Sequence, residues 1–580
     1  MISELVGSPI VAQAAADQNR QGQLGARRAP ETVMTLARLG SFHQTRLSFL
    51  RSLLRRIARE GWQFHRSLWE VDAHGEGVGV YCLQTPYQIY SLICFAHDLP
   101  AEKRSDRVIA DEWDAAFVLY DGTPTPQEIE RLRANAPRQE AGRYTERDLV
   151  LSRANRSVRL FDHVVDCLAA GRQPEQAELA RIGYLMRTTA VYGNGKFGLA
   201  DRSLIKTRAE LAGPFQAEML AVWLIRRFTI DIVEHMARQK APQTAVALSA
   251  ELRRVLGVGN ATGLGMAPFL VHHPSLIDRW IDARETALAR IRSLPAAAPQ
   301  SRQHFCDYID RAQGLAAHWQ VNDVIQAERI AGLSRDLTQL KDHVAVFDWA
   351  EPLPWDRLFL WAEAALGLEA QEMLVSLLFE PHGALIDELA DQMAIDEVME
   401  FPLDGSMTVT RFRQLIEQHY SFALKRDYEA REAQARFWYV SEEKLEPRLG
   451  ERFEEPGGAL EQPLGIARDI AALHAACLLY PPQRPLADFL REYPDFRRNA
   501  RRVQVAARHP YAEVRDNLLS AEMRPIDLLR CKLSFFGAMR FDPKSDRWVR
   551  ITLFQHAPQP EDIEAGDADD WAPPPVAAWG

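Results

Sequence analysis

A short glycine-rich segment at residues 192–198 carries the residue types that hold a bound anion. It reads Tyr-Gly-Asn-Gly-Lys-Phe-Gly, so bare backbone N–H groups lie beside an amide and a lysine. Glycine lets a ligand approach the backbone closely, and successive N–H groups can cradle a phosphate or a carboxylate. Lys196 would add a positive charge. The candidate binding residues here are Gly193, Asn194, Gly195, Gly198 and Arg202.

The same three glycines fit the Gly-x-Gly-x-x-Gly spacing of dinucleotide-binding proteins. That motif needs a buried parallel strand before it and a helix after it. Residues 186–192 instead include an arginine and two threonines, and residues 199–211 are highly charged. The sequence therefore favours a general anion-binding loop over a dinucleotide site. A purely structural turn is the remaining alternative.

A second glycine-rich segment occupies residues 257–265 and reads Gly-Val-Gly-Asn-Ala-Thr-Gly-Leu-Gly. Four glycines in that run cannot continue the helix expected over 249–256, so we expect a loop. A helix that starts at Pro274 follows, and its free N–H groups and dipole would favour an anion. The candidate binding residues in this loop are Gly257, Gly259, Asn260, Thr262 and Gly263.

Three residues are candidates for catalysis if the two loops converge. Lys196 and His272 belong to the loop regions, and Glu218 lies on an apolar helix between them. Burial raises the pKa of a carboxylate, which would suit Glu218 to proton transfer. Two of the three have a plainer explanation, because His272 can be a structural histidine and Glu218 can form a buried salt bridge to an arginine. The sequence does not decide whether the loops meet.

Other patterns that could carry chemistry are weaker. Residues 438–452 mix aromatic and charged side chains, and form either a binding loop or a solvated loop with ion pairs. Asp387 and Asp391 have the spacing of a metal–diphosphate motif, but its second half is missing, so we interpret them as a solvated helix face. Glu-x-x-His, His-Glu-x-x-His, Gly-x-Ser-x-Gly and P-loop motifs are absent. Their absence argues against di-iron bundles, zincins, α/β-hydrolases and P-loop NTPases.

Hydrophobic periodicity predicts the helices that would position these segments. We expect a basic amphipathic helix over 46–60, a mostly buried helix over 214–238 and an amphipathic helix over 274–294. The arginines of 46–60 could face a membrane surface or pair with acidic neighbours. We favour pairing because the chain as a whole is acidic.

Strands are expected in two places. Residues 78–83 and 115–120 read as strands, and a capping box at 125–128 starts a helix after them. Apolar residues alternate again at 533–541 and 547–554, which predicts a hairpin.

The expected fold class is mainly α, with a multi-helix core, a small α+β N-terminal unit and a C-terminal β-hairpin. Composition and chain breaks divide the sequence into five segments. They are a disordered tail at 1–33, an α+β unit with the basic helix at 34–150, a helical domain with both glycine-rich loops at 151–295, a helical domain with the hairpin at 301–560, and a disordered acidic tail at 561–580.

Charge and composition narrow the classes of partner. The 580 residues carry a formal charge of -10, which disfavours nucleic acid as the main partner. The sequence contains no apolar stretch of about 18 residues, so no membrane-spanning helix is expected. None of the six cysteines has Cys-x-x-Cys spacing, so no metal site is expected and a reducing, cytoplasmic compartment is favoured. The sequence is compatible with a homo-oligomer and does not decide the oligomeric state.

These observations favour a cytoplasmic enzyme that binds an anionic small molecule or cofactor, bearing phosphate or carboxylate, at the glycine- and asparagine-rich loops. The reaction type and the identity of any cofactor are unknown at this level. The alternative is a non-catalytic helical binding or scaffold protein with a protein partner, in which the glycines allow close packing of helices.

Overall fold

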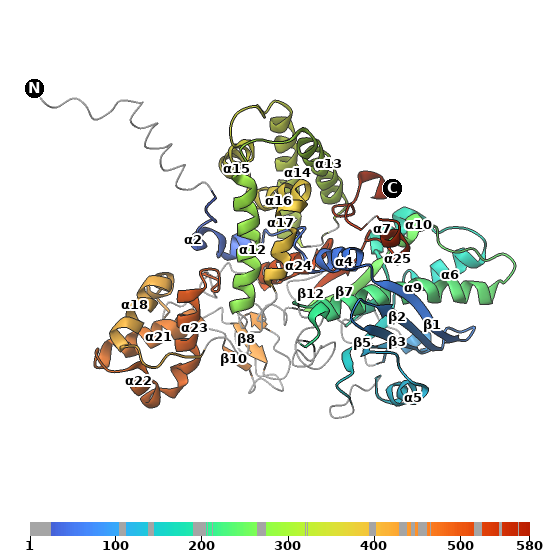
Figure 1. Ribbon diagram of the computed structural model, residues 1–580, viewed down its shortest axis with the longest axis horizontal. Coiled ribbons are helices and arrows are strands. Elements are labelled where there is room, and N and C mark those ends of the chain that lie inside the picture. Colours follow the sequence, from blue (N-terminus) through green and yellow to red (C-terminus); the bar gives the residue numbers. More distant parts are fainter. Residues whose placement is uncertain are drawn as a thin grey trace, which may run out of the picture.

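In the computed structural model of the chain, the described residues fall into ranges separated by short gaps. They are 25–103, 112–136, 144–189, 205, 207–211, 213–263, 274–319, 321, 323–393, 402–428, 438–441, 447–449, 461–463, 466–515, 525–543, 548–566 and 568–579. Over these ranges the chain is mostly helical and also contains a large sheet (Figure 1).

Nine of the described strands form one sheet, in the order β1-β2-β3-β4-β5-β6-β7-β12-β11. They are β1 (Gln63–Val71), β2 (Gly77–Gln84), β3 (Ile89–Ala96), β4 (Ala115–Asp121), β5 (Asp148–Arg156), β6 (Tyr184–Thr188), β7 (Gly257–Gly263), β12 (Trp548–Leu553) and β11 (Arg540–Pro543). Neighbours in this order are antiparallel, apart from β6 and β7, which run parallel. A small second sheet has the order β10-β8-β9, with β8 at Trp438–Ser441, β9 at Pro447–Leu449 and β10 at Glu461–Pro463.

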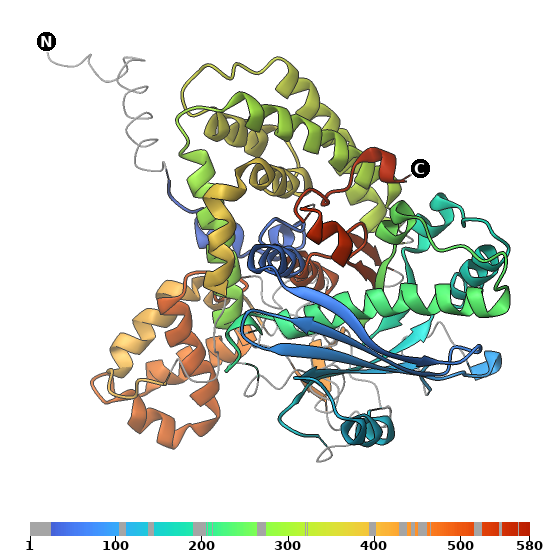
Figure 2. The ribbon, with the colours of Figure 1, turned by 45° about the vertical axis from the view of Figure 1, so that its right-hand side comes forward.

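The large sheet buries both of its faces. Side chains alternate along β2, so that Tyr81 and Leu83 belong to the main core while Val78 and Val80 belong to a second cluster. On the main-core side the sheet is crossed by α9 (Gln216–Lys240), as Figure 2 shows. The second cluster includes residues of α5 (Pro126–Asn135), on the opposite face.

Several shorter helices pack against α9, against one another or against the other helices. They are α2 (Pro30–Val33), α3 (Leu36–Leu39), α4 (Phe49–Glu60), α6 (Phe161–Ala169), α7 (Gln176–Ile182), α10 (Ala250–Val255), α24 (Pro525–Phe536) and α25 (Pro560–Glu564). Of these, α4 packs against α9, α24 and α25, so it lies between the sheet and the helices above it (Figure 1).

Two further groups of helices complete the molecule. The upper group in Figure 1 contains α12 (Pro274–Arg292), α13 (Pro299–His318), α14 (Val324–Ala345), α15 (Pro354–Ala365), α16 (Leu368–Phe379), α17 (Gly383–Ile386) and the 3-10 helix η5 (Asp387–Met393). The lower group contains α18 (Val409–His419), α19 (Ser421–Leu424), α21 (Ile466–Leu479), α22 (Leu486–Glu492) and α23 (Arg497–Arg508). Contacts of α12 with both α15 and α23 join the two groups.

A buried ion cluster lies inside the upper group. Glu372 of α16 accepts hydrogen bonds from Arg28 at 2.7 Å and from Arg38 at 2.6 Å, and also from Arg284. Arg28 makes two more bonds, each of 2.7 Å, to Glu285. A buried carboxylate needs such partners because removal from water strongly disfavours its charge. Segments far apart in the sequence are therefore tied together at Glu372.

Several expected elements are confirmed. The helix predicted over 214–238 is α9, and the one predicted over 274–294 is α12. The strands predicted at 78–83 and 115–120 correspond to β2 and β4, and the capping box of Thr125 and Glu128 is present. The arginines before and within α4 do pair with acidic residues: Arg46 bonds Asp387 at 2.8 Å, and Arg51 bonds Glu380 at 2.8 Å.

Two expectations about the fold are wrong, and a third, the C-terminal hairpin, is confirmed only in part. The β structure is not a small N-terminal unit, because the sheet has nine strands and includes the C-terminal hairpin. Only the short strands β11 and β12 form that hairpin, and residues 533–536 end helix α24 instead. The expected loop at 257–265 is, as far as Gly263, strand β7. The sheet joins strands from all three expected units, whose boundaries stay a prediction.

The two tails also differ from the expected disorder. Residues 1–24 lie outside the described part of the chain, but Arg28 in the predicted tail is buried in the ion cluster. At the other end Trp571 is only 1% exposed, and Asp570 accepts a hydrogen bond of 2.8 Å from Tyr308. The described residues of both segments, 25–33 and 561–579 without 567, include side chains with partners in the core, which composition alone does not reveal.

Candidate functional site

The parallel pair β6 and β7 brings together two strands that lie next to the glycine-rich segments in the sequence. Strand β7 contains the first seven residues of the second segment, whereas residues 192–198 lie outside the described part of the chain. Tyr184 lies opposite Gly257, and Arg187 lies opposite Gly259. The chain leaves β6 after Thr188, passes through α9 and α10 and returns to form β7. Residues 192–198 follow β6, and residues 264–273 follow β7. Parallel strands joined by a helical crossover commonly bind ligands just outside their carboxyl ends.

Asn260 ties the two strands together at this edge. Its Nδ2 donates a hydrogen bond of 2.7 Å to the backbone carbonyl of Thr188, the last residue of β6. The side chain is 1% exposed, and its Oδ1 has no hydrogen-bond donor in the described part of the chain. A buried acceptor without a donor is rare, because desolvating it costs free energy. The Asn260 amide thus has one anchored end and one end able to accept a ligand's hydrogen bond.

The strand before the first glycine-rich segment exists, contrary to expectation. Residues 184–188 are all buried and form β6, despite the arginine and the threonine within it. Pairing with β5 explains this, since Asn155 lies opposite Arg187 and Ala154 lies opposite Thr188. Strand pairing and burial therefore override the polar composition of the segment.

Two of the predicted binding glycines have a packing reason to be glycine. A Cβ atom on Gly259 would lie 2.7 Å from the ring of Tyr184, and one on Gly257 would lie 2.3 Å from the carbonyl oxygen of Leu553. Neither neighbour can move easily, because one is a buried ring and the other is backbone of β12. These glycines allow β7 to fit between its neighbours, and a role in binding stays a prediction.

The other predicted residues fall into two groups. Thr262 and Gly263 belong to β7, where they lie opposite Val549 and Trp548 of β12. The remaining candidates lie outside the described residues, so their placement is untested. They are Gly193, Asn194, Gly195, Lys196, Gly198, Arg202 and His272.

Glu218 lies in the first turn of α9 and is buried. Its charge acts on Lys532 of α24, a fully buried lysine whose Nζ lies 5.4 Å from the ring centre of Phe215 and 5.2 Å from that of Phe536. Burial lowers the pKa of Lys532 well below its usual value, and the nearby carboxylate opposes that shift. Lys532 is therefore one charged group close to Glu218, while the expected salt bridge to an arginine and the role of Glu218 in proton transfer stay predictions.

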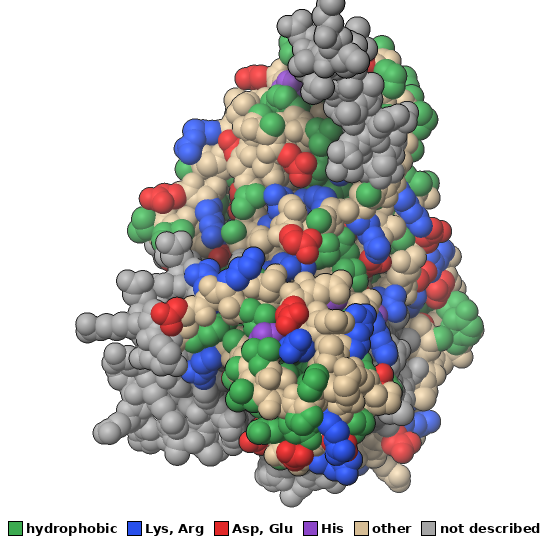
Figure 3. Space-filling model, turned by 90° about the vertical axis from the view of Figure 1, so that its left-hand side faces the viewer, with side chains coloured by type: hydrophobic (Ala, Val, Ile, Leu, Met, Phe, Trp, Pro, Cys, Tyr) green, Lys and Arg blue, Asp and Glu red, His purple; other side chains and the backbone are tan. Residues whose placement is uncertain are grey.

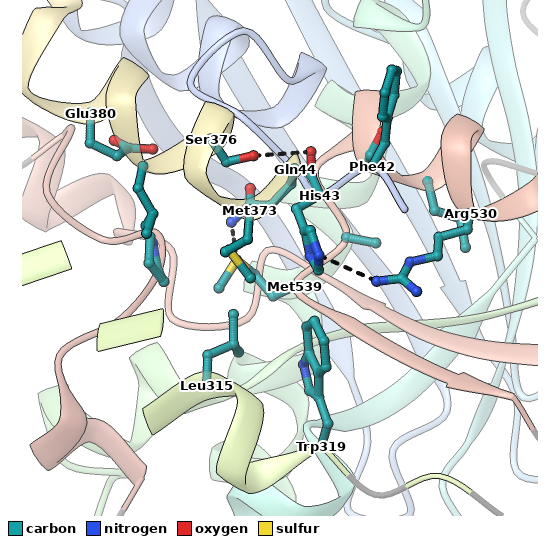
Figure 4. A pocket seen from close by; sticks show the side chains of 15 residues that line it. Phe42, His43, Gln44, Leu315, Trp319, Met373, Ser376, Glu380, Arg530 and Met539 are labelled. Atoms are coloured by element: carbon teal, nitrogen blue, oxygen red, sulfur yellow. Dashed lines mark hydrogen bonds between the residues drawn. The ribbon is translucent and has the colours of Figure 1, made fainter. Parts of the chain in front are cut away.

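A small cavity beside His43 is shown in Figure 4. His43 stacks on Trp319 with ring centres 5.7 Å apart, and its Nε2 lies 3.0 Å from a carboxylate oxygen of Glu369. The hydroxyl of Ser376 points to the backbone carbonyl of His43 at 3.5 Å and not to the imidazole (Figure 4). The cavity has a volume of about 40 Å³, which is room for a few water molecules. We assign no reaction to it.

The described residues contain no cluster of three or more His, Cys, Asp or Glu side chains able to hold a metal ion. No helix among them is long and apolar enough to cross a membrane. On the face shown in Figure 3, basic and acidic side chains are interspersed with hydrophobic ones. The edge of β6 and β7 therefore remains the best candidate site.

Comparisons of the chain with models of known protein families, with curated proteins and with solved structures gave no match.

Proposed function

We propose that the protein is an enzyme that binds an anionic small molecule, bearing a phosphate or a carboxylate, at the carboxyl-terminal edge of β6 and β7. The observation that supports the proposal is the parallel pairing of these two strands, because the first glycine-rich segment follows β6 in the sequence and β7 contains most of the second. A ligand there would meet backbone N–H groups from two segments at once.

Asn260 supports this position for the site. Its Nδ2 is held by Thr188 at 2.7 Å, so the amide is oriented before any ligand binds. Its free Oδ1 would accept a hydrogen bond from a ligand hydroxyl or amide, next to the anionic group. Lys196 and the backbone of residues 192–198 would bind the anionic group itself.

Ligand-induced thermal stabilisation tests the proposal. The purified chain is heated with a panel of nucleotides, sugar phosphates and organic di- and tricarboxylates. A ligand at a hundred times its dissociation constant stabilises the folded state by about 2.7 kcal/mol, which shifts the melting temperature measurably. We expect a member of the panel to raise the melting temperature, and expect Lys196→Ala and Asn260→Ala to abolish the shift.

Lys341→Ala is the matched control, because Lys341 is half-exposed, pairs with Asp310 at 2.7 Å and lies on α14. Its shift should equal that of the wild type. Equal shifts in all three variants would overturn the proposed site. In that case a protein partner recovered in stoichiometric amount would favour the alternative, a binding or scaffold protein.

A further inference from the structure

A second cavity lies beside α4 and the start of α9. Its volume is about 540 Å³, within the range of small-molecule sites. Its walls come from α4, from the turn before α9, from η5 and from the C-terminal segment. The charged and polar residues that define it are Arg55, Arg56, Arg59, Gln216, Asp387 and Asp569.

Arg55 differs from the arginines around it. Arg46 and Arg51 hold carboxylates in two-point contacts, and Arg56 donates to the carbonyl of Glu210 at 2.8 Å. Arg55 lies 3.5 Å from Asp387 and 3.8 Å from Asp569, which is too far for a hydrogen bond in either case. Both of its Nη atoms are shielded from solvent and have no acceptor among the residues that the structure describes.

Burying the Nη donors of Arg55 without hydrogen-bond acceptors destabilises the folded state. Arg46 bonds both oxygens of Asp387 and also Oδ2 of Asp569. Oδ1 of Asp569 lies 3.8 Å from Nη1 of Arg55 and has no hydrogen-bond donor among the described residues. Burial lowers the pKa of Arg55 to about 10, so the group stays charged at neutral pH. Its side chain lines the cavity, and its Nη donors lie just beneath the cavity wall without an acceptor among the described residues. A buried guanidinium with free donors is well suited to bind two oxygens of one phosphate or carboxylate group.

We propose that this cavity binds a small molecule through one phosphate or carboxylate group, held by the Nη atoms of Arg55. Arg56 and Arg59 add positive charge beside it, while Asp387, Asp391 and Asp569 keep the surroundings close to neutral. Selection thus rests on the hydrogen-bond donors of Arg55 rather than on net charge. The site is separate in its residues from the edge of β6 and β7.

Isothermal titration of the full chain with inorganic phosphate, pyrophosphate and citrate tests the site. The three probes separate phosphate from carboxylate as the preferred group. We expect at least one probe to bind the wild type, and Arg55→Met to weaken that binding by about tenfold or more. Arg55→Lys keeps the charge but loses the two-point geometry, so it should bind with intermediate affinity. Asp569→Asn should tighten binding, because it removes a negative charge next to the ligand.

Arg290→Ala is the control, since Arg290 is partly exposed, pairs with Glu388 at 2.8 Å and does not line the cavity. Asn260→Ala should also leave this binding unchanged, which separates the inference from the proposed function. The inference is overturned if no probe binds at millimolar concentration, because water alone would then satisfy Arg55. It is equally overturned if a probe binds Arg55→Met as tightly as the wild type.

Discussion

The side-chain amide of Asn260 donates a hydrogen bond of 2.7 Å to the backbone carbonyl of Thr188 and so joins the middle of β7 to the end of the parallel strand β6. The donor is what matters in this contact, because the acceptor is a fixed backbone oxygen. Two substitutions can therefore distinguish the effect of losing the donor from the effect of losing side-chain volume. One keeps the size of the side chain, and the other makes it smaller.

We predict that Asn260→Asp destabilises the protein more than Asn260→Ala. Alanine removes one buried hydrogen bond, at a cost of about 1–2 kcal/mol. Aspartate keeps the shape but places a carboxylate oxygen against the carbonyl of Thr188 at a site that is 1% exposed, and burying an unpaired charge costs more. Urea unfolding of both variants measures the difference. An aspartate variant as stable as the wild type would show that the amide donor is not needed.

The contrast between Arg51 and Arg55 gives a second prediction, because the two residues lie one turn apart on α4. Arg51 is 1% exposed and bonds both oxygens of Glu380. Arg51→Met would leave that carboxylate buried without its main partner, and we expect a loss of about 3–5 kcal/mol. Arg55→Met removes a desolvated guanidinium whose Nη atoms have no hydrogen-bond acceptor in the part of the chain that the structure describes, so stability should stay level or rise.

Chemical unfolding of the two variants, with wild type as reference, measures this difference. Methionine is used at both positions because it preserves most of the apolar length of the arginine side chain. Equal destabilisation by both substitutions would show that Arg55 is as well satisfied as Arg51, and would remove the reason to place a ligand beside it.

The sequence was most informative where one element could be recognised by itself. The apolar circumference of α9 predicted a buried helix, and the capping box of Thr125 predicted the start of α5, because both signals are local. Strand β3 is an apolar run from Ile89 to Ala96 that contains one polar residue, Ser91, and periodicity cannot distinguish such a run from a buried helix. Strand β7 was hidden for the opposite reason. Its three glycines predict a loop, whereas the close approach of Tyr184 requires one of them.

The candidate sites could be predicted only in part. Asn260 and the two glycine-rich segments stand out in the sequence, but the parallel pairing that relates them depends on a crossover of about seventy residues between the strands. The cavity beside Arg55 was missed, because its walls meet only in the fold. Asp387 lies 332 positions after Arg55 (387 − 55), and Asp569 lies 514 positions after it (569 − 55). No local pattern in 46–60 distinguishes Arg55 from Arg51.

Glu372 gives a prediction about pH. Three arginines bond this fully buried carboxylate and hold its pKa well below its usual value, against the opposing effect of burial. The unfolded chain, with an ordinary pKa near 4.5, binds more protons below that pH than the folded chain does. The contribution of Glu372 to stability is therefore complete above about pH 4.5 and is lost as the pH falls below it.

Glu372→Gln should lower stability at pH 7 by about 3–5 kcal/mol, because it leaves buried arginines without their carboxylate. The variant should also lose less stability than the wild type between pH 5 and pH 3, which urea unfolding at several pH values would show. Glu388→Gln is the control, since Glu388 is 71% exposed and its pair with Arg290 should contribute less than about 1 kcal/mol. A wild-type acid dependence that persists unchanged in Glu372→Gln would contradict the role given to the cluster.

The last prediction concerns the C-terminal segment, whose acidic and proline-rich composition suggested disorder. Trp571 is 1% exposed, and its neighbours Asp569 and Asp570 are bonded by Arg46, Tyr308 and Arg311. Trp571→Ala should therefore lower the free energy of unfolding by about 3–5 kcal/mol, as expected for a large buried side chain. Glu564→Ala, at an exposed position of the same segment, should change it by less than about 0.5 kcal/mol. Guanidinium unfolding measures both, and equal small effects would mean that the segment is not packed in solution.

Because Asp569 also borders the cavity of Arg55, loosening the C-terminal segment by Trp571→Ala should weaken anion binding there as well. The loss of stability and the loss of binding should therefore occur together.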